Sequence, residues 1–242
     1  MSNTTTMDTI LFDLDGTLLP MENNRFIDLY YDGMAIVGEP YGISRQYLYD
    51  VVEEAFVTMM HNKGTMTNQE LFFSRMKENA GHNYELICRI FERFSDVEFD
   101  TVRQCTGCNP MAGQWIRTLR DKGYRIILAT NPLFPARCTR RRIQWAGMDP
   151  EDFALVTSYE DHCYAKPSRG YFLEVMNRCN ISPSQCMMVG NDVREDMVAA
   201  DLGMRVYLLK NNMVNSRNLD YSMYPQGYYE DFTRVVAALP AL

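Results

Sequence analysis

Ten residues near the start of the chain, Ile10–Leu19, constrain its fold and function more than any other stretch. The apolar run Ile10–Phe12 predicts a short buried strand, and Gly16 marks its end. Because side chains alternate along a strand, Asp13 and Asp15 point to the same side. Two adjacent carboxylates repel each other unless a cation or a shared proton relieves them. The pair is therefore a candidate reactive site, although DxDG sequences also occur in ordinary turns.

Size and charge exclude several classes of protein. A chain of 242 residues can form one substantial core and a smaller second domain, and 46% hydrophobic with 23% charged residues is typical of soluble globular proteins. The net charge of −7 argues against nucleic acid or an anionic membrane as a partner. We expect one local exception, a run of arginines, to form a solvated helix face rather than a phosphate site: Arg137, Arg140, Arg141 and Arg142.

The sequence favours a cytoplasmic location. No stretch approaches the ~20 apolar residues of a membrane span. The segment Met1–Thr6 is polar and lacks the basic and apolar regions of a signal peptide. Seven cysteines, an odd and scattered set, fit a reducing compartment. Cys105 and Cys108 form a CxxC without a second half, so neither zinc nor redox chemistry is expected there. Oligomeric state is not indicated.

The region 21–104 is predicted to be entirely helical. Apolar residues recur at helical spacing over 26–37, 44–59, 68–76 and 83–94. Ser44 is placed to cap the second of these helices, and Thr67 with Glu70 forms a capping box at the start of the third. Four helices without an intervening strand indicate an inserted helical module, whose apolar stripes form its core.

Beyond residue 105 the pattern alternates between helix and strand. Asn109, Pro110 and Gly123 delimit a first helix. Strands are then expected over 124–129, 154–157, 186–189 and 205–209, and helices over 135–146, 168–179, 193–202 and 232–239. This alternation predicts an α/β fold, a parallel sheet with helices on both sides. Ligands bind such sheets outside the carboxyl ends of the strands, where Asp13, Thr130, Lys166 and Asn191 converge.

The set of motifs resembles the haloacid dehalogenase superfamily. It comprises Asp13-Leu14-Asp15-Gly16-Thr17, then Thr130 after a second strand, then Lys166-Pro167, and finally Gly190-Asn191-Asp192 with Asp196. Each motif alone is weak, but all four occur in order. The resemblance implies a Rossmann-like α/β core formed by residues 1–20 and 105–242. It also implies that residues 21–104 form a helical C1 cap.

The resemblance implies catalytic roles that make chemical sense. Asp13 is the expected nucleophile toward phosphorus, forming an aspartyl-phosphate. Asp15 is the expected general acid for the leaving alcohol and then the base for water. Thr130, Lys166 and the backbone amides near Leu14 and Asn131 are expected to bind the phosphoryl oxygens, with Lys166 also stabilising Asp13.

A bare carboxylate would be repelled by a phosphate dianion, so Mg²⁺ is the expected cofactor. The implied ligands are the Asp13 side chain, the Asp15 backbone carbonyl and the fourth motif. Many relatives carry an aspartate where this chain has Asn191, a neutral and weaker ligand. We therefore expect Asp192 to be the main carboxylate ligand of that motif, with Asn191 assisting. Asp196 is expected to orient Lys166 or to bind the metal through water.

These features predict a phosphatase that acts on a small phosphorylated metabolite. Asp15 favours phosphate esters over haloacids, since a halide leaving group needs no proton. A phosphomutase of the β-phosphoglucomutase type shares all four motifs and stays open as an alternative. A non-catalytic phosphate-binding module is a weaker one, because such proteins usually lose the nucleophile or the lysine.

Overall fold

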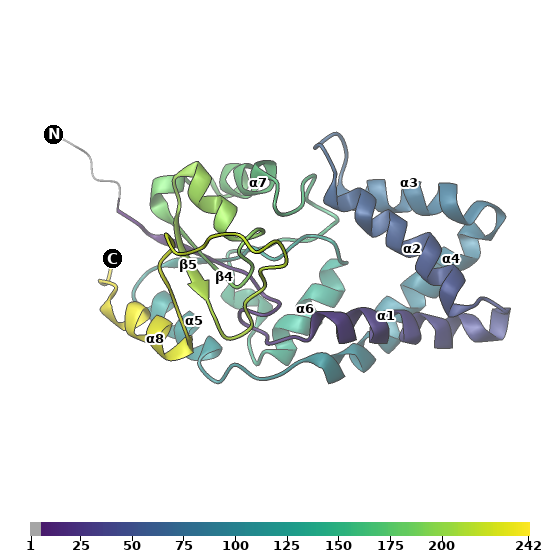
Figure 1. Cartoon of the computed structure of the whole chain (residues 1–242), viewed down its shortest axis with the longest axis horizontal. Helices are drawn as coiled ribbons and strands as arrows, with labels where there is room; N and C mark the ends of the chain where they lie inside the picture. Colours follow the sequence, from purple (N-terminus) through teal and green to yellow (C-terminus); the bar gives the residue numbers. More distant parts are fainter. Residues whose placement is uncertain (1–5) are drawn as a thin grey trace.

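The computed structural model describes residues 6–242, so most of the segment used above to argue against a signal peptide lies outside the described residues. A six-stranded parallel sheet organises the larger lobe (Figure 1), in the order β3-β2-β1-β4-β5-β6. Its strands are β1 (Thr9–Phe12), β2 (Arg125–Leu128), β3 (Leu155–Val156), β4 (Cys186–Gly190), β5 (Arg205–Leu209) and β6 (Gln226–Gly227).

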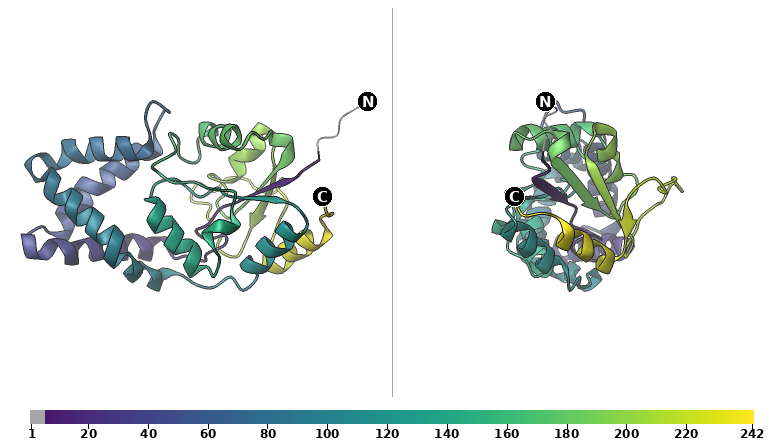
Figure 2. Two further views of the ribbon diagram at one scale, coloured as in Figure 1. Left: turned by 180° about the vertical axis from the view of Figure 1, so that it is seen from behind. Right: turned by 90° about the vertical axis from the view of Figure 1, so that its left-hand side faces the viewer.

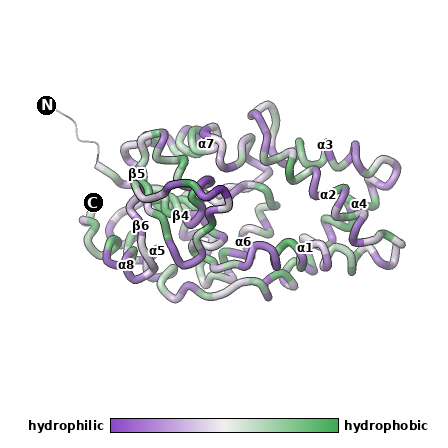
Figure 3. Tube along the Cα trace, viewed as in Figure 1, coloured by the Kyte–Doolittle hydropathy of each residue, from purple (hydrophilic) through white to green (hydrophobic). Residues whose placement is uncertain are grey.

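Alternating strand residues build two apolar layers, one on each face of the sheet. Phe12 packs on one side with α5 (Ala112–Asp121) and α8 (Tyr229–Ala238), whereas Leu11 packs on the other with α7 (Arg169–Cys179). The right-hand view of Figure 2 shows the strands between these two layers. In Figure 3 the central strands are coloured as hydrophobic, as expected for strands buried on both faces.

A second lobe is formed by four helices, which lie together at one end of the molecule (Figure 1). They are α1 (Asn23–Gly38), α2 (Arg45–Met60), α3 (Asn68–Ala80) and α4 (Tyr84–Arg93), followed by a π-helix over Phe94–Glu98 and a 3₁₀-helix over Phe99–Cys105. The Ser44 hydroxyl accepts from the Tyr47 amide, and Thr67 and Glu70 form the expected capping box. The aromatic core of this helical lobe extends to α6 (Ala136–Trp145), which joins the lobe to the sheet.

The predicted α/β class is confirmed, with local differences. The segment 193–202 is not an α-helix: only Met197–Leu202 is helical, and it is a 3₁₀-helix. The two-residue strand β6 was not predicted, because so short a pairing has no sequence periodicity. The cap boundaries at residues 21 and 104 stay a prediction. No helix of the described residues is both long and apolar enough to cross a membrane.

Candidate active site

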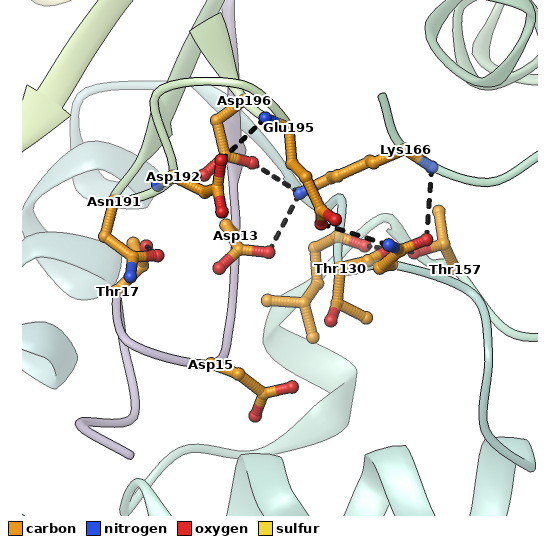
Figure 4. Close-up of polar contacts among 12 residues, drawn as sticks. Asp13, Asp15, Thr17, Thr130, Thr157, Lys166, Asn191, Asp192, Glu195 and Asp196 are labelled. Atoms are coloured by element: carbon orange, nitrogen blue, oxygen red, sulfur yellow. Dashed lines mark hydrogen bonds and ion pairs between the residues drawn. The ribbon is translucent and has the colours of Figure 1, made fainter. Parts of the chain in front are cut away.

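The polar residues singled out in the sequence gather at the carboxyl edge of the sheet. Phe12 pairs with Leu128 on one side and with Val189 on the other, so the three central strands end at the same level. Asp13, Thr130 and Asn191 follow these strand ends, and Lys166 reaches them from the loop before α7. Figure 4 shows the resulting group of side chains.

Lys166 connects two carboxylates at the centre of this group. Its ammonium lies 2.8 Å from Oδ1 of Asp13 and 2.6 Å from Oδ1 of Asp196, and the lysine side chain is only 1% exposed. The other carboxylate oxygen of Asp196 accepts a hydrogen bond from the Asp192 amide at 3.0 Å. Asp196 thus fixes both the lysine and the loop after β4. A side chain at Gly190 would collide with the Asp196 carboxylate, so this arrangement requires glycine there.

Burial and charge perturb the pKa values in the site. Burial acts to lower the pKa of Lys166, but Asp13 and Asp196 outweigh it and raise that pKa well above its usual range. Burial raises the pKa of Asp196 to about 7 although Lys166 opposes the shift. Burial likewise raises the pKa of Glu195 to about 7. The lysine is therefore the permanent positive charge of the site.

Asp15 lies apart from the lysine network and is paired with Arg142 of α6. Its carboxylate points away from Asp13 in Figure 4 and forms an ion pair with the Arg142 guanidinium, which is 1% exposed. Arg142 also donates to the Thr139 hydroxyl at 3.0 Å and lies over the ring of Phe134. Burial raises the pKa of Asp15, and Arg142 opposes that rise. The other carboxylate oxygen of Asp15 is buried without a partner among the described residues.

The expectation of a solvated arginine face is wrong for Arg142. The residue lies four positions after the buried Cys138, which places it on the buried stripe of α6. The same spacing could have identified it from the sequence. Arg140 is exposed, as expected, whereas Arg137 pairs with Glu92 of α4 at 2.5 Å.

Thr130 and Asn131 border the space in front of Asp13. Thr130 is buried, and its carbonyl accepts from Tyr171 and Thr157. The Asn131 side chain donates to Glu195 at 3.0 Å and accepts from the Lys166 amide at 3.1 Å. In the described part of the chain, the backbone amides of Leu14 and Asn131 make no hydrogen bond. They are therefore free to bind an oxyanion.

Asn191 and Asp192 are both held in place by neighbours. The Asn191 amide oxygen accepts from the Thr17 hydroxyl at 3.0 Å. One Asp192 carboxylate oxygen accepts from the Arg194 and Glu195 amides at 2.7 and 2.8 Å. Gly16, with φ of +89°, lies so close to Asn191 that a side chain there would overlap it. The glycine of the DxDG motif thus allows the first and fourth motifs to approach each other.

The donor set suits a hard divalent cation. Figure 4 shows the Asp13, Asn191 and Asp192 side chains facing one space, and all three line a cavity of about 160 Å³. Asp15, Glu195 and Asp196 also line this cavity, and none of its lining residues is basic. Such an acidic site would repel a phosphate dianion unless a cation entered with it. Among residues 6–242, no group of three or more His, Cys, Asp or Glu side chains is arranged to hold a metal ion. The expected magnesium ligands do not form such a group, because they are two carboxylates, an amide oxygen and a backbone carbonyl.

Glu195 was not expected in the site from the sequence. It lines the acidic cavity together with Asp192 and Asp196 and bonds to Asn131. Its sequence signal is its position between Asp192 and Asp196 of the fourth motif, although Glu195 itself belongs to none of the four motifs.

Comparison with known proteins identifies the family. Over residues 7–202 the chain matches the haloacid dehalogenase-like hydrolases. The protein therefore belongs to this family, and the predicted membership and hydrolase class are confirmed.

Individual relatives are distant. The D-glycero-β-D-manno-heptose-1,7-bisphosphate 7-phosphatase of Haemophilus ducreyi is 29% identical over 111 residues, which cover 37% of this chain and 60% of that protein. A 2-haloacid dehalogenase from Pseudomonas syringae pv. Tomato has a TM-score of 0.66 at 17% identity, with 96% of this chain and 99% of that chain covered. The HAD-hydrolase YfnB of Bacillus subtilis, described as bound to magnesium, has a TM-score of 0.58 at 16% identity, with 96% of this chain and 100% of that chain covered. The two structures show likeness of fold.

Proposed function

We propose that the protein is a magnesium-dependent phosphatase that acts on a small phosphorylated metabolite through an aspartyl-phosphate on Asp13. The observation that carries this proposal is the pair of carboxylates at one cavity: Asp13 is held by Lys166, and Asp15 lies apart from the lysine. Two carboxylates in different surroundings suit two different roles. The phosphatase name of the Haemophilus relative supports the same class. With a haloacid substrate Asp15 would have no role as a general acid, because a departing halide needs no proton.

In the first half of the reaction, an Asp13 oxygen forms a bond to phosphorus while the bond to the ester oxygen breaks. Asp15 gives its proton to the departing alkoxide. Lys166 and the free amides of Leu14 and Asn131 stabilise the negative charge on the phosphoryl oxygens. Thr130, buried beside them, adds a hydroxyl donor.

In the second half, Asp15 takes a proton from water as the water oxygen bonds to phosphorus. The bond between phosphorus and Asp13 breaks, and inorganic phosphate and the free carboxylate are released. The ion pair with Arg142 supports this basic role, since it favours the ionised form of Asp15. Asp196 acts through Lys166, whose ammonium it keeps in place.

Mg²⁺ would be held by the Asp13 and Asp192 carboxylates, the Asn191 amide oxygen and the Asp15 carbonyl. When bound, it would neutralise the phosphate dianion and so allow the approach of a carboxylate. The magnesium described for the YfnB structure supports this choice of cation. The seven free cysteines support a reducing, cytoplasmic location.

The deciding experiment is hydrolysis of 4-nitrophenyl phosphate by the purified protein, with Mg²⁺ and with EDTA. We expect release of nitrophenol that depends on the metal and vanishes in Asp13→Asn, a substitution of nearly equal size. A folded Asp13→Asn protein with substantial activity would refute the role of Asp13. If the wild-type protein releases nothing, a sugar monophosphate with catalytic bisphosphate tests for the phosphomutase alternative.

A further inference from the structure

A second cavity, of about 350 Å³, lies between the helical lobe and the sheet, beside the acidic cavity. The two share lining residues at the catalytic edge, Asp15, Asn23, Asn131 and Glu195. An ester whose phosphate occupies the acidic cavity would therefore extend its alcohol portion into this second space.

Most of this cavity is apolar and aromatic. Phe26 and Tyr30 of α1, Phe56 of α2 and Phe134 before α6 form mutual ring contacts with centroid distances of 5.4–5.9 Å. These rings come from three segments far apart in the sequence, and Figure 1 shows α1 next to α6. Such walls favour an alcohol with a ring-sized apolar body.

All the charges that line the cavity are negative: Asp15, Glu53 and Glu195, with no lysine, arginine or histidine. Arg142 does not line it; the guanidinium lies 4.8 Å from the centroid of the Phe134 ring and is paired with Asp15. A second phosphate or carboxylate on the substrate would therefore be desolvated against carboxylates with no cation to receive it. The bisphosphate named for the Haemophilus relative is thus a poor fit to this space.

Glu53 of α2 supplies the specific recognition group. One of its oxygens accepts from the hydroxyl of Tyr31, which is 2% exposed, at 2.7 Å. Within the part of the chain that the structure describes, Glu53 forms no ion pair, whereas its neighbour Glu54 lies 3.7 Å from Arg75 on the outside of the same helix. A half-buried carboxylate among aromatic rings, with no cation of its own, is suited to bind an ammonium group.

Building on the phosphatase proposed above, we infer that the substrate is a phosphate monoester of an apolar amino alcohol. Its phosphate reacts at Asp13, its apolar body lies against the aromatic walls, and its protonated amine pairs with Glu53. The cavity selects against substrates that carry a second anionic group.

Three aryl phosphates of similar shape and leaving-group acidity test this inference. Their para substituents are 2-aminoethyl, n-propyl and 2-carboxyethyl, so they differ at the far end in charge: positive, neutral and negative. We expect kcat/KM to be about tenfold higher for the amine than for the propyl compound, and lower again for the acid. Glu53→Gln should reduce the preference for the amine to within about twofold, because it keeps the shape and removes the charge. Glu54→Gln is the matched control and should keep the preference.

The outcomes separate the two proposals. If the wild-type enzyme cleaves all three compounds at similar rates, or if Glu53→Gln keeps the preference for the amine, the inferred substrate class is wrong while the phosphatase stands. If none of the three is cleaved and 4-nitrophenyl phosphate is not cleaved either, the phosphatase itself is wrong.

Discussion

Arg142 and Asp15 form a partly buried ion pair that joins α6 to the loop after β1, although they lie 127 positions apart in the chain. The arginine is almost completely buried, and the aspartate is the proposed acid and base. The ion pair therefore serves the fold and the reaction together. It connects the sheet to the helix that packs against the helical lobe, and it holds a carboxylate away from Lys166.

Loss of Arg142 should be costly to stability. Arg142→Met keeps the length of the side chain but leaves Asp15 without its cation. Because the Asp15 side chain is 24% exposed, the loss of stability should be about 2 kcal/mol, less than for a fully buried pair. Arg140→Met on the same helix removes only an exposed pair with Glu151 and should cost less than about 1 kcal/mol. Urea unfolding measures both. Adding Asp15→Asn to Arg142→Met should recover part of the loss; equal losses in the two single variants would contradict a special role for this pair.

Lys166 is expected to be essential for the rate of reaction. Lys166→Met removes the buried ammonium that contacts Asp13 and Asp196, so kcat should fall by about 10²–10³-fold at saturating Mg²⁺. Asp196→Asn keeps an oxygen for the lysine and should cost less, about tenfold. Steady-state kinetics with 4-nitrophenyl phosphate compares them. A Lys166→Met enzyme within tenfold of the wild-type rate would exclude this role.

Magnesium titration distinguishes the contributions of Asp192 and Asn191 as metal ligands. Asp192→Asn keeps the oxygen that accepts from the Arg194 and Glu195 amides and removes only charge. The Mg²⁺ concentration for half-maximal activity should therefore rise by about tenfold or more. Asn191→Asp adds a carboxylate and should lower that concentration. An unchanged titration for Asp192→Asn, together with inactivity of Asn191→Ala, would make Asn191 the main ligand instead.

Much of the architecture could be predicted because it depends on local patterns. The apolar run Ile10–Phe12 placed Asp13 and Asp15 after a buried strand, and the Ser44 and Thr67 caps marked helix starts that the structure reproduces. The expectation that Asp13 and Asp15 point to the same side is wrong, because β1 ends at Phe12 and the Asp15 carboxylate turns to Arg142 while Asp13 contacts Lys166. The carboxyl-edge rule for parallel sheets brought Thr130, Lys166 and Asn191 together without knowledge of their distances.

The parts that could not be predicted depend on contacts between distant segments. The pairing of Arg142 with Asp15 and the approach of Glu53 to the aromatic cavity follow from how the helical lobe meets the sheet. Charge composition also gave a wrong prediction for one residue. A run of four arginines favours a solvated helix face on average, but Arg142 lies on the buried stripe of α6.

His162 should make stability depend on pH. The side chain is completely buried, with Nδ1 3.1 Å from the Ser158 carbonyl and Nε2 without a partner among the described residues. Burial lowers the pKa of His162, although Glu174 and Asp161 oppose the shift. The unfolded chain, with a histidine pKa of about 6.5, therefore binds a proton first as the pH falls. The contribution of His162 is fully present above about pH 6.5 and is lost below it, with a slope of up to about 1.4 kcal/mol per pH unit.

Urea unfolding at pH 7.5 and pH 5.5 measures this effect as a difference between proteins. The wild type should lose about 1 kcal/mol more on acidification than His162→Asn, which keeps a donor for Ser158 and does not titrate. Buried carboxylates with raised pKa values, such as Asp196, act in the opposite direction, but they are common to both proteins and cancel in the comparison. His61→Asn, at an exposed position, should follow the wild type. If His162→Asn loses as much stability as the wild type between the two pH values, the buried histidine is not the source of the acid sensitivity.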